Sequence, residues 1–378
     1  MSKDLTRFAS IFFFIIAVLL VPHSIMAATF VGSCQPGSYP TISAAVGAAT
    51  AGAIIKVCPG TYPEQVVIGT SLTLEGITSG NASRAVITVP GSGFATTITE
   101  VTHGDTVTPQ VLVTVPGVNI SNITVDGTGA SISTKWFAGI FYESGSSGII
   151  KGVTTRNQTA AMGAGIWAEN GTSTSESVTI ENSSVHDANE LGIYVASNQT
   201  PPTLTATVLR NHVVTSSFVS IGNYNANASI TSNVVTVTGG GAYGIAMVNN
   251  SVGSITSNTV SNAYYGILVY VGSPTSQSSS IKSNLVLNSI YYGVWIEGAN
   301  NATVESNTIV QGPVGIEFQC SAGLGSNTVK NNTISDVTIG LDSVPSSVVS
   351  PNIYDNVDTI RTGACGFAPT APPLPPLP

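Results

Sequence analysis

Apolar and polar residues alternate along most of the chain in short units that recur every 22 to 30 residues. One segment of each unit begins at a small residue, as in Gly192-Ile-Tyr-Val195, and another leads to an asparagine, as in Ile230-Thr-Ser-Asn233-Val-Val235. Alternation with period two predicts strands, with Ile193 on the inner face and Tyr194 on the outer face. A unit this short cannot bury its own apolar side, so the repeat predicts a stack of coils.

One asparagine recurs three residues after an apolar position and two residues before a β-branched one, at spacings of 22, 25, 26, 23 and 25 residues. Identical amides on neighbouring coils can hydrogen-bond one another and the backbone at an inward-facing turn. We therefore predict an internal ladder rather than a binding site. Its members are Asn211, Asn233, Asn258, Asn284, Asn307 and Asn332, and a similar stack is expected for Tyr243, Tyr265 and Tyr292.

The repeated pattern Gly-Ile followed by Ile-x-x-Asn-x-Ile resembles the right-handed parallel β-helix of the pectin-lyase-like superfamily, over about residues 35–350. The segments Ile54 to Ile68 and Leu72 to Gly76 resemble the opening of pectin methylesterases. The resemblance implies an all-β chain, a single-stranded right-handed parallel β-helix of about ten to twelve coils. Many chemistries and several non-enzymes share this scaffold, so the fold alone implies no activity.

The N-terminus carries the features of a secretory signal. Lys3 and Arg7 precede an apolar run from Ile11 to Val21, and small residues follow. This pattern predicts a signal peptide over residues 1–27 and a secreted or periplasmic protein. The run is too short for a permanent bilayer span, so no membrane span is expected after signal removal.

The rest of the chain divides into three predicted parts. Residues 28–50 form an N-terminal cap, with a short helix over 42–50 whose N-cap is Thr41. The β-helix occupies residues 51–350, and an irregular cover with a Pro-rich tail occupies 351–378. Because covered ends leave no strand edge to pair, we expect a monomer.

Four cysteines form one pair near each end of the repeats. An exported chain meets an oxidising compartment, and the sequence has no Cys-x-x-Cys motif or histidine cluster for a metal. Disulfides Cys34–Cys58 and Cys320–Cys365 are therefore predicted.

Charge narrows the range of partners. The chain has 19 acidic and 11 basic residues, and charged residues make up only 8% of it. A basic stripe that could neutralise phosphates is missing, which argues against nucleic acid as a partner. A surface of serine, threonine and asparagine instead favours a polysaccharide.

One outward column carries ionisable groups only in the first three aligned coils, namely Asp126, Arg156 and His186, with Asp187 next in the sequence. Coils stack about 4.8 Å apart, so these side chains should form a row. A guanidinium can pair with a uronate carboxylate, and a histidine beside an acid can act as general base or acid. The row predicts a lyase-type or epimerase-type site, and its alternative is a salt bridge that ties coils together.

Known family signatures support this assignment only weakly. The His186-Asp187 pair is similar to one in β-helical mannuronan epimerases, but the surrounding residues do not match that family's motif. The segments typical of pectin methylesterases, polygalacturonases and pectate lyases are not found.

Aromatic and acidic residues also follow the glycines on the outer side of the first strand. Rings in a row can stack on sugar faces, and carboxylates beside them can accept hydrogen bonds from hydroxyls. The predicted substrate-binding residues are Phe141, Glu143, Trp167, Glu169, Tyr194, Trp295 and Glu297. The alternative is that the rings shield the sheet beneath a loop such as Ser131 to Trp136.

No cofactor is expected, although Glu143 and Glu169 on adjacent coils could also take Ca²⁺. Two functions follow from the sequence. The first is a secreted protein that binds an acidic polysaccharide, with lyase-type or epimerase-type modification of it left open. The second is a non-catalytic structural or adhesive extracellular solenoid.

Overall fold

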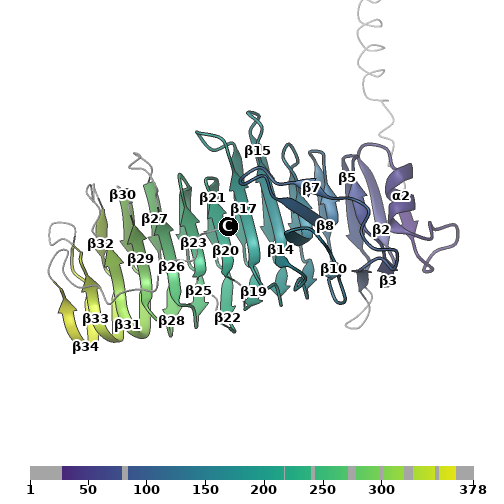
Figure 1. Cartoon of the computed structure of the whole chain (residues 1–378). Helices are drawn as coiled ribbons and strands as arrows, with labels where there is room; N and C mark the ends of the chain where they lie inside the picture. The colour runs from purple at the N-terminus through teal and green to yellow at the C-terminus, as the bar shows by residue number, and fades with distance from the viewer. Residues whose placement is uncertain are drawn as a thin grey trace, which may run out of the picture.

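The computed structural model describes residues 28–78, 84–216, 218–239, 243–270, 278–297, 301–318, 327–344 and 349–362. These residues form an all-β parallel solenoid of about 11 turns, with the coils stacked side by side along one axis (Figure 1). The coil pattern predicted from the repeat is confirmed. The predicted signal peptide and Pro-rich tail lie outside the described residues.

One side of the solenoid is a twelve-stranded parallel sheet, which we call the ladder sheet because the asparagine ladder follows its strands. Its strands alternate buried and more exposed residues, as expected for a sheet with one face inside. In spatial order they are β1 (Thr29–Val31), β2 (Ala53–Val57), β5 (Leu72–Gly76), β9 (Val118–Ser121), β12 (Gly148–Lys151), β15 (Glu176–Glu181), β18 (Leu204–Leu209), β21 (Asn227–Thr231), β24 (Val252–Thr256), β27 (Ser278–Lys282), β30 (Asn301–Glu305) and β32 (Thr328–Lys330).

The other two sides belong to one 22-stranded sheet. Nine strands form a short row: β3 (Gly60–Pro63), β6 (Ala85–Thr88), β10 (Ile123–Asp126), β13 (Thr154–Arg156), β16 (Ser184–His186), β19 (His212–Thr215), β22 (Val234–Val237), β25 (Thr259–Ser261) and β28 (Leu285–Leu287). Nine more form a long row: β4 (Val66–Ile68), β8 (Thr106–Val113), β11 (Trp136–Tyr142), β14 (Met162–Asn170), β17 (Leu191–Ser197), β20 (Val219–Tyr224), β23 (Tyr243–Val248), β26 (Tyr265–Tyr270) and β29 (Tyr292–Glu297).

The two rows fuse in the last coils, where β31 (Thr308–Phe318) pairs with both β28 and β29, followed by β33 (Thr333–Asp342) and β34 (Ile353–Arg361). The remaining strand, β7 (Ile98–Thr99), pairs antiparallel with β8. Because β34 pairs in parallel with β33, regular stacking continues past residue 350. An irregular cover was predicted there, and the strand forms because β pairing uses backbone groups that any suitable segment can supply.

The interior of each coil is filled by aliphatic side chains from all three sides. In one coil Ile166 of β14, Ile180 of β15 and Val185 of β16 are completely buried. Such side chains form one continuous core along the axis. Burial of this apolar surface, at roughly 25 cal/mol per Å², is the main favourable term in folding.

At the N-terminal end, helix α2 (Ile42–Ala48) packs its residues Ile42, Ala45 and Val46 into the core. The Thr41 hydroxyl accepts a hydrogen bond from the Ala44 N–H at 3.1 Å, as predicted for its N-cap. The backbone is extended at Ala49, so the helix ends two residues before the predicted position. Its role as a cover for the stack stays a prediction.

The predicted disulfide Cys34–Cys58 is present, with 5.7 Å between the Cα atoms. The second predicted pair, Cys320–Cys365, lies outside the described residues. In the described part of the chain, no helix is long and apolar enough to cross a membrane.

The asparagine ladder is internal and every amide in it is used. The Asn258 Nδ2 donates to Asn284 Oδ1 at 3.0 Å and to the Ile230 carbonyl at 2.9 Å. Its Oδ1 accepts from the N–H and the Nδ2 of Asn233, both at 2.9 Å. All six predicted members are at most 2% exposed. The prediction of a ladder is confirmed.

The ladder extends one step beyond the prediction at each end. Ser183 donates its N–H to Asn211 Oδ1 at 2.9 Å, and its hydroxyl accepts from the Val153 N–H at 3.2 Å. At the other end, Asn352 Oδ1 accepts from Asn332. The residue that precedes the ladder position is left-handed in most coils, as at Ser257 with φ 57°. The ladder therefore fixes the turn between the ladder sheet and the short row.

Most long strands need a glycine near their start; β20 has Ser220 at this position instead. A Cβ added at Gly266 would lie 2.5 Å from the Gly293 carbonyl oxygen of the next coil and 2.3 Å from Val286 Cγ1. Equivalent contacts with the next coil's backbone occur at Gly139, Gly165, Gly192, Gly244, Gly293, Gly315 and Gly340. The repeated glycine thus reflects close approach between coils.

We predict that Asn258→Ala lowers the free energy of unfolding by roughly 1–3 kcal/mol, because it leaves buried groups on both neighbouring coils without partners. Chemical denaturation of the purified protein measures this change. Ser229→Ala, which alters an exposed hydroxyl on the ladder sheet, is the matched control. Equal stability of the two variants would contradict the ladder's role.

Gly266→Ala is predicted to lower the free energy of unfolding by about 1–3 kcal/mol, because backbone has to move to accept the methyl group. Gly47→Ala in α2 places its methyl group in open space and should be neutral or stabilising. The thermal midpoints of both variants test the contrast. A Gly266→Ala midpoint at or above that of the wild type would show that the coils can separate without cost.

Candidate functional site

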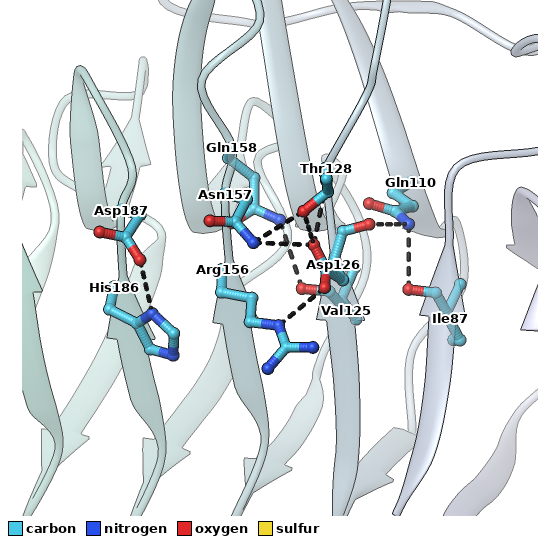
Figure 2. Close-up of polar contacts among 10 residues, drawn as sticks. All are labelled: Ile87, Gln110, Val125, Asp126, Thr128, Arg156, Asn157, Gln158, His186 and Asp187. Carbon is cyan, nitrogen blue, oxygen red and sulfur yellow. Dashed lines mark hydrogen bonds and ion pairs between the residues drawn. The ribbon is translucent and has the colours of Figure 1, made fainter. Parts of the chain in front are cut away.

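The predicted row of ionisable residues lies at the ends of three short strands. Asp126 ends β10, Arg156 ends β13 and His186 ends β16, and these residues are direct partners in the sheet register. Figure 2 shows the three side chains on successive coils, with Asp187 beside His186. The sequence alignment of these coils is therefore confirmed in the structure.

Asp126 is the most tightly held member of the row. Its Oδ1 accepts from Asn157 Nδ2 at 2.9 Å and from the Thr128 hydroxyl at 2.6 Å, and its Oδ2 accepts from Arg156 Nε at 2.8 Å. Burial alone would raise its pKa, but the hydrogen bonds from Asn157, Thr128 and Arg156 outweigh burial and lower the pKa to about 2. Asp126 is thus a fixed carboxylate.

Arg156 is oriented by Asp126 and remains open on its other side. Only its Nε bonds the protein, and within the described residues neither Nη group has a hydrogen-bond partner. Its side chain is 40% exposed. The terminal fork of the guanidinium is therefore available to bind a planar anion such as a carboxylate.

His186 pairs with its sequence neighbour rather than with Arg156. Its Nδ1 lies 2.8 Å from Asp187 Oδ2 and its side chain is 33% exposed. Asp187 has a left-handed backbone with φ 60°, which aspartate tolerates better than most residues. The pairing orients the imidazole and leaves Nε2 without a protein partner among the described residues.

Several residues around the row have no counterpart in the sequence prediction. Arg84 donates to the Thr154 hydroxyl at 3.3 Å, on the same strand as Arg156. Behind the row, buried Gln110 donates to the carbonyls of Ile87 and Asp126 (Figure 2). Arg84 could not be found because it precedes its strand, outside the repeat alignment.

The predicted aromatic platform is closed. Phe141, Trp167, Tyr194 and Trp295 lie in register-matched positions on the outer side of the long row, but each is at most 5% exposed. Their rings pack on one another, with 5.2 Å between the ring centroids of Trp167 and Tyr194. They belong to a second apolar cluster outside the coils, so an open stacking surface is not present at these four residues.

A segment between β6 and β8, residues 89–105, accounts for the burial of Trp167 and Tyr194; we call it the strap. Its Ile98 packs against the aromatic cluster. The Asn198 amide donates to the Val101 carbonyl at 3.0 Å, which fixes the strap over coils far along the chain. The sequence proposed a cover from Ser131 to Trp136; instead, Trp136 is itself buried in the cluster.

The tyrosine stack is present as predicted. The ring centroids of Tyr243 and Tyr265 are 5.2 Å apart, and those of Tyr265 and Tyr292 are 5.7 Å apart. All three rings are buried on the outer side of the long row. The stack therefore contributes to the same apolar cluster.

The predicted acidic residues lie away from the row. Glu169 is near the end of β14, seven residues after Met162, which places it roughly 23 Å along the strand from the corner that follows Arg156. Glu143 lies in the corresponding turn one coil earlier, and Glu297 ends β29. The carboxylates of Glu143 and Glu169 therefore do not converge with Arg156 and His186.

Burial perturbs these carboxyl groups. It raises the pKa of Glu169 to about 8, reinforced by Glu100 and Glu143 and opposed by a hydrogen bond from the Val101 N–H. Burial also raises the pKa of Glu143 and of Glu297. In the last coils, burial and the adjacent Asp342 raise the pKa of Glu317 to about 9.

Comparison with known proteins supports the fold. The A-module of the Azotobacter vinelandii mannuronan C-5 epimerase AlgE4 is similar, with a TM-score of 0.55 and 17% identity over 86% of this chain and 91% of that one. The Dettilon tailspike protein gp208 has a TM-score of 0.57 and 16% identity over 82% of this chain and 61% of that one. The chain is a parallel β-helix protein with the pectin-lyase-like fold.

A family model described as "Periplasmic copper-binding protein (NosD)" matches residues 170–357 of this β-helix protein. No curated protein sequence matches the chain. Copper favours thioether, thiolate and imidazole ligands. Across the described ranges there is no group of three or more His, Cys, Asp or Glu residues that could hold a metal, and Met247 is buried in the core. The donor set of the described residues therefore does not fit copper.

The pKa of Glu169 predicts a pH dependence of stability. A carboxyl group whose pKa is raised on folding stabilises the protein most below its usual pKa of 4.5, and this contribution is lost as pH rises through about 8. The thermal midpoint of the β-helix should therefore decrease as the pH is raised from about 5 to about 9. Glu169→Gln stays neutral and should show a smaller fall, whereas Glu176→Gln is the control and should follow the wild type. Parallel curves for wild type and Glu169→Gln would contradict the assignment.

Proposed function

We propose that this β-helix protein binds an acidic polysaccharide through the outer face of the short row, at Arg156 with Arg84. The proposal rests on one observation: the Arg156 guanidinium is held at Nε by a fixed carboxylate, while neither Nη group bonds any residue that the structure describes. An oriented guanidinium loses little entropy when it binds a carboxylate in a bidentate manner. Arg84, which donates a hydrogen bond to the Thr154 hydroxyl, places a second cation beside the strand of Arg156.

Local charge rather than overall charge carries this binding. The chain has a formal net charge of −8, which repels a polyanion at long range. Binding would therefore depend on direct contacts at the two arginines. Serine and threonine hydroxyls of neighbouring short strands, such as Thr154 and Ser184, supply partners for sugar hydroxyls.

A second candidate function is proton abstraction from the bound uronate, as in a lyase or an epimerase. It is favoured by the Asp187–His186 contact of 2.8 Å, which leaves His186 Nε2 facing outward on the coil next to Arg156. Arg156 would neutralise the sugar carboxylate, and Nε2 would take the proton from the carbon α to it. Asp126 would be a positioning residue, because its oxygens are already bonded to Arg156, Asn157 and Thr128.

The alternative is a non-catalytic extracellular solenoid that serves adhesion or structure. The closed aromatic cluster favours this alternative, because the long strands present no open row of rings on which a polysaccharide could stack. In that case the Asp126–Arg156 pair only ties two coils together. Both proposals share three properties: the protein is exported to the periplasm or the exterior, it is a monomer, and it requires no cofactor.

The decisive experiment separates binding from turnover. Arg156→Ala should weaken binding of oligomannuronate or oligogalacturonate by about 10-fold or more, since a charge-assisted pair is lost. His186→Ala should keep binding and lose turnover, because the imidazole acts mainly in the transition state. Calorimetry and detection of unsaturated or epimerised products measure the two effects.

Arg210→Ala is the matched control, because Arg210 pairs with Glu181 on the ladder sheet, away from the row. It should change neither binding nor turnover. If the wild type neither binds nor alters these oligosaccharides, and Arg156→Ala only loses thermal stability, the row is a structural tie and the solenoid has no uronate site.

A further inference from the structure

A second polar site lies where the strap crosses the corners that follow the long strands. A cleft of about 410 Å³ opens there. It is bounded on one side by the strap and on the other by the corners of three successive coils. Its lining residues are Thr102, Ser197, Asn198, Tyr224, Asn225, Asn249 and Asn250.

The coil corners hold their asparagines in a fixed arrangement. Tyr224 ends β20, and Asn225 follows with a left-handed φ of 50°. One coil later, Asn249 follows β23 with a φ of 58°. Because coils are about 4.8 Å apart, corners on three coils span roughly 10 Å, the length of about two sugar units.

Hydrogen-bonding capacity is left over in this cleft. Asn225 is 6% exposed, and its Nδ2 donates to the carbonyls of Ser197 and Gln199, yet its buried Oδ1 has no partner within the described part of the chain. The side chains of Asn249 and Asn250 also have no hydrogen-bond partner among the described residues. The Oδ1 of Asn225 is closed off from solvent. The amides of Asn249 and Asn250 are partly exposed and line the cleft, so their donors and acceptors are open to a ligand there.

The strap wall is pre-organised. The Glu100 carboxylate accepts from the N–H groups of Thr102 at 2.6 Å, His103 at 2.9 Å and Asp105 at 2.9 Å. His103 and Tyr224 form an edge-to-face contact, with 5.7 Å between ring centroids. Both the strap and the aromatic side chain are therefore fixed before any ligand arrives, which lowers the entropic cost of binding.

We infer that this cleft binds a neutral saccharide of about two sugar units. No lining residue carries a charge, so the cleft offers nothing to compensate a buried uronate or phosphate. Amides and hydroxyls both donate and accept, which matches sugar hydroxyls, and the Tyr224 ring offers a surface for the apolar face of a pyranose. The inference does not depend on the uronate site, which lies on the short row.

The test uses neutral trisaccharides, namely maltotriose, cellotriose, β-1,4-mannotriose and tri-N-acetylchitotriose, with the purified full-length protein. Saturation-transfer NMR and calorimetry detect millimolar binding. At least one trisaccharide should bind. Tyr224→Ala should weaken its binding by about 10-fold or more, and Asn250→Ala by about 3- to 10-fold, the effect of losing one or two neutral hydrogen bonds.

Two controls assign the effect to the cleft. Asn227→Ala removes an exposed amide on the ladder sheet two residues beyond Asn225 and should bind as the wild type does. Arg156→Ala should also retain neutral binding. Because the Asn250 side chain is partly exposed, its loss should not unfold the protein, and the thermal midpoint checks this.

The inference is overturned if no trisaccharide binds the wild type, or if Asn250→Ala and Tyr224→Ala bind as tightly as it does. It is also overturned if an oligogalacturonate competes equally well at the cleft, because the site would then accept charge. If the wild-type protein binds a neutral trisaccharide but no oligouronate, the proposed function is refuted and this inference stands.

Discussion

Contact between neighbouring coils is the constraint on which the rest of the structure depends. Parallel pairing holds successive coils at a fixed, short separation, so each residue lies beside its equivalent one unit earlier and one unit later. At the corners between strands, a side chain that cannot fit within the spacing between neighbouring coils is excluded. Glycine at the start of the long strands and asparagine after the ladder sheet satisfy this condition in different ways, one by removing the side chain and the other by bonding it to its own copy.

The same contact places side chains from equivalent positions of successive repeats in rows along the axis. Asp126, Arg156 and His186 lie on one line because their strands pair in register. On this line Arg156 pairs with Asp126 one coil away, and the line ends where the next coil supplies Val214. On the ladder sheet the same rule produces ion pairs such as Lys282–Glu305 and Glu305–Lys330, which are surface ties of modest energy.

The outer face of the long row follows a different logic. Its aromatic and aliphatic side chains form a second core, and the strap, which reaches the coil of Asn198, contributes Ile98 to it. This cover buries Glu169 and so raises its pKa, and its far end creates the polar cleft at Tyr224. The strap therefore covers the aromatic residues that could have stacked on a saccharide along the strands. It also forms one wall of the polar cleft at the coil corners.

The sequence by itself determined the parallel coils, their register, the asparagine ladder and the tyrosine stack, because each follows from local periodicity repeated at a fixed spacing. It also determined the Cys34–Cys58 bond, because the two cysteines form a pair near one end of the repeats in a chain predicted to be exported. Near-continuous apolar runs such as Trp136–Tyr142 indicate that the long strands are buried on both faces. The burial of Trp167, the separation of Glu169 from Arg156 and the position of Arg84 were decided only by the tertiary structure. The burial of Trp167 and the position of Arg84 depend on the path of a non-repeating segment, which has no period from which that path could be derived. The separation of Glu169 from Arg156 depends on the length of β14 between them.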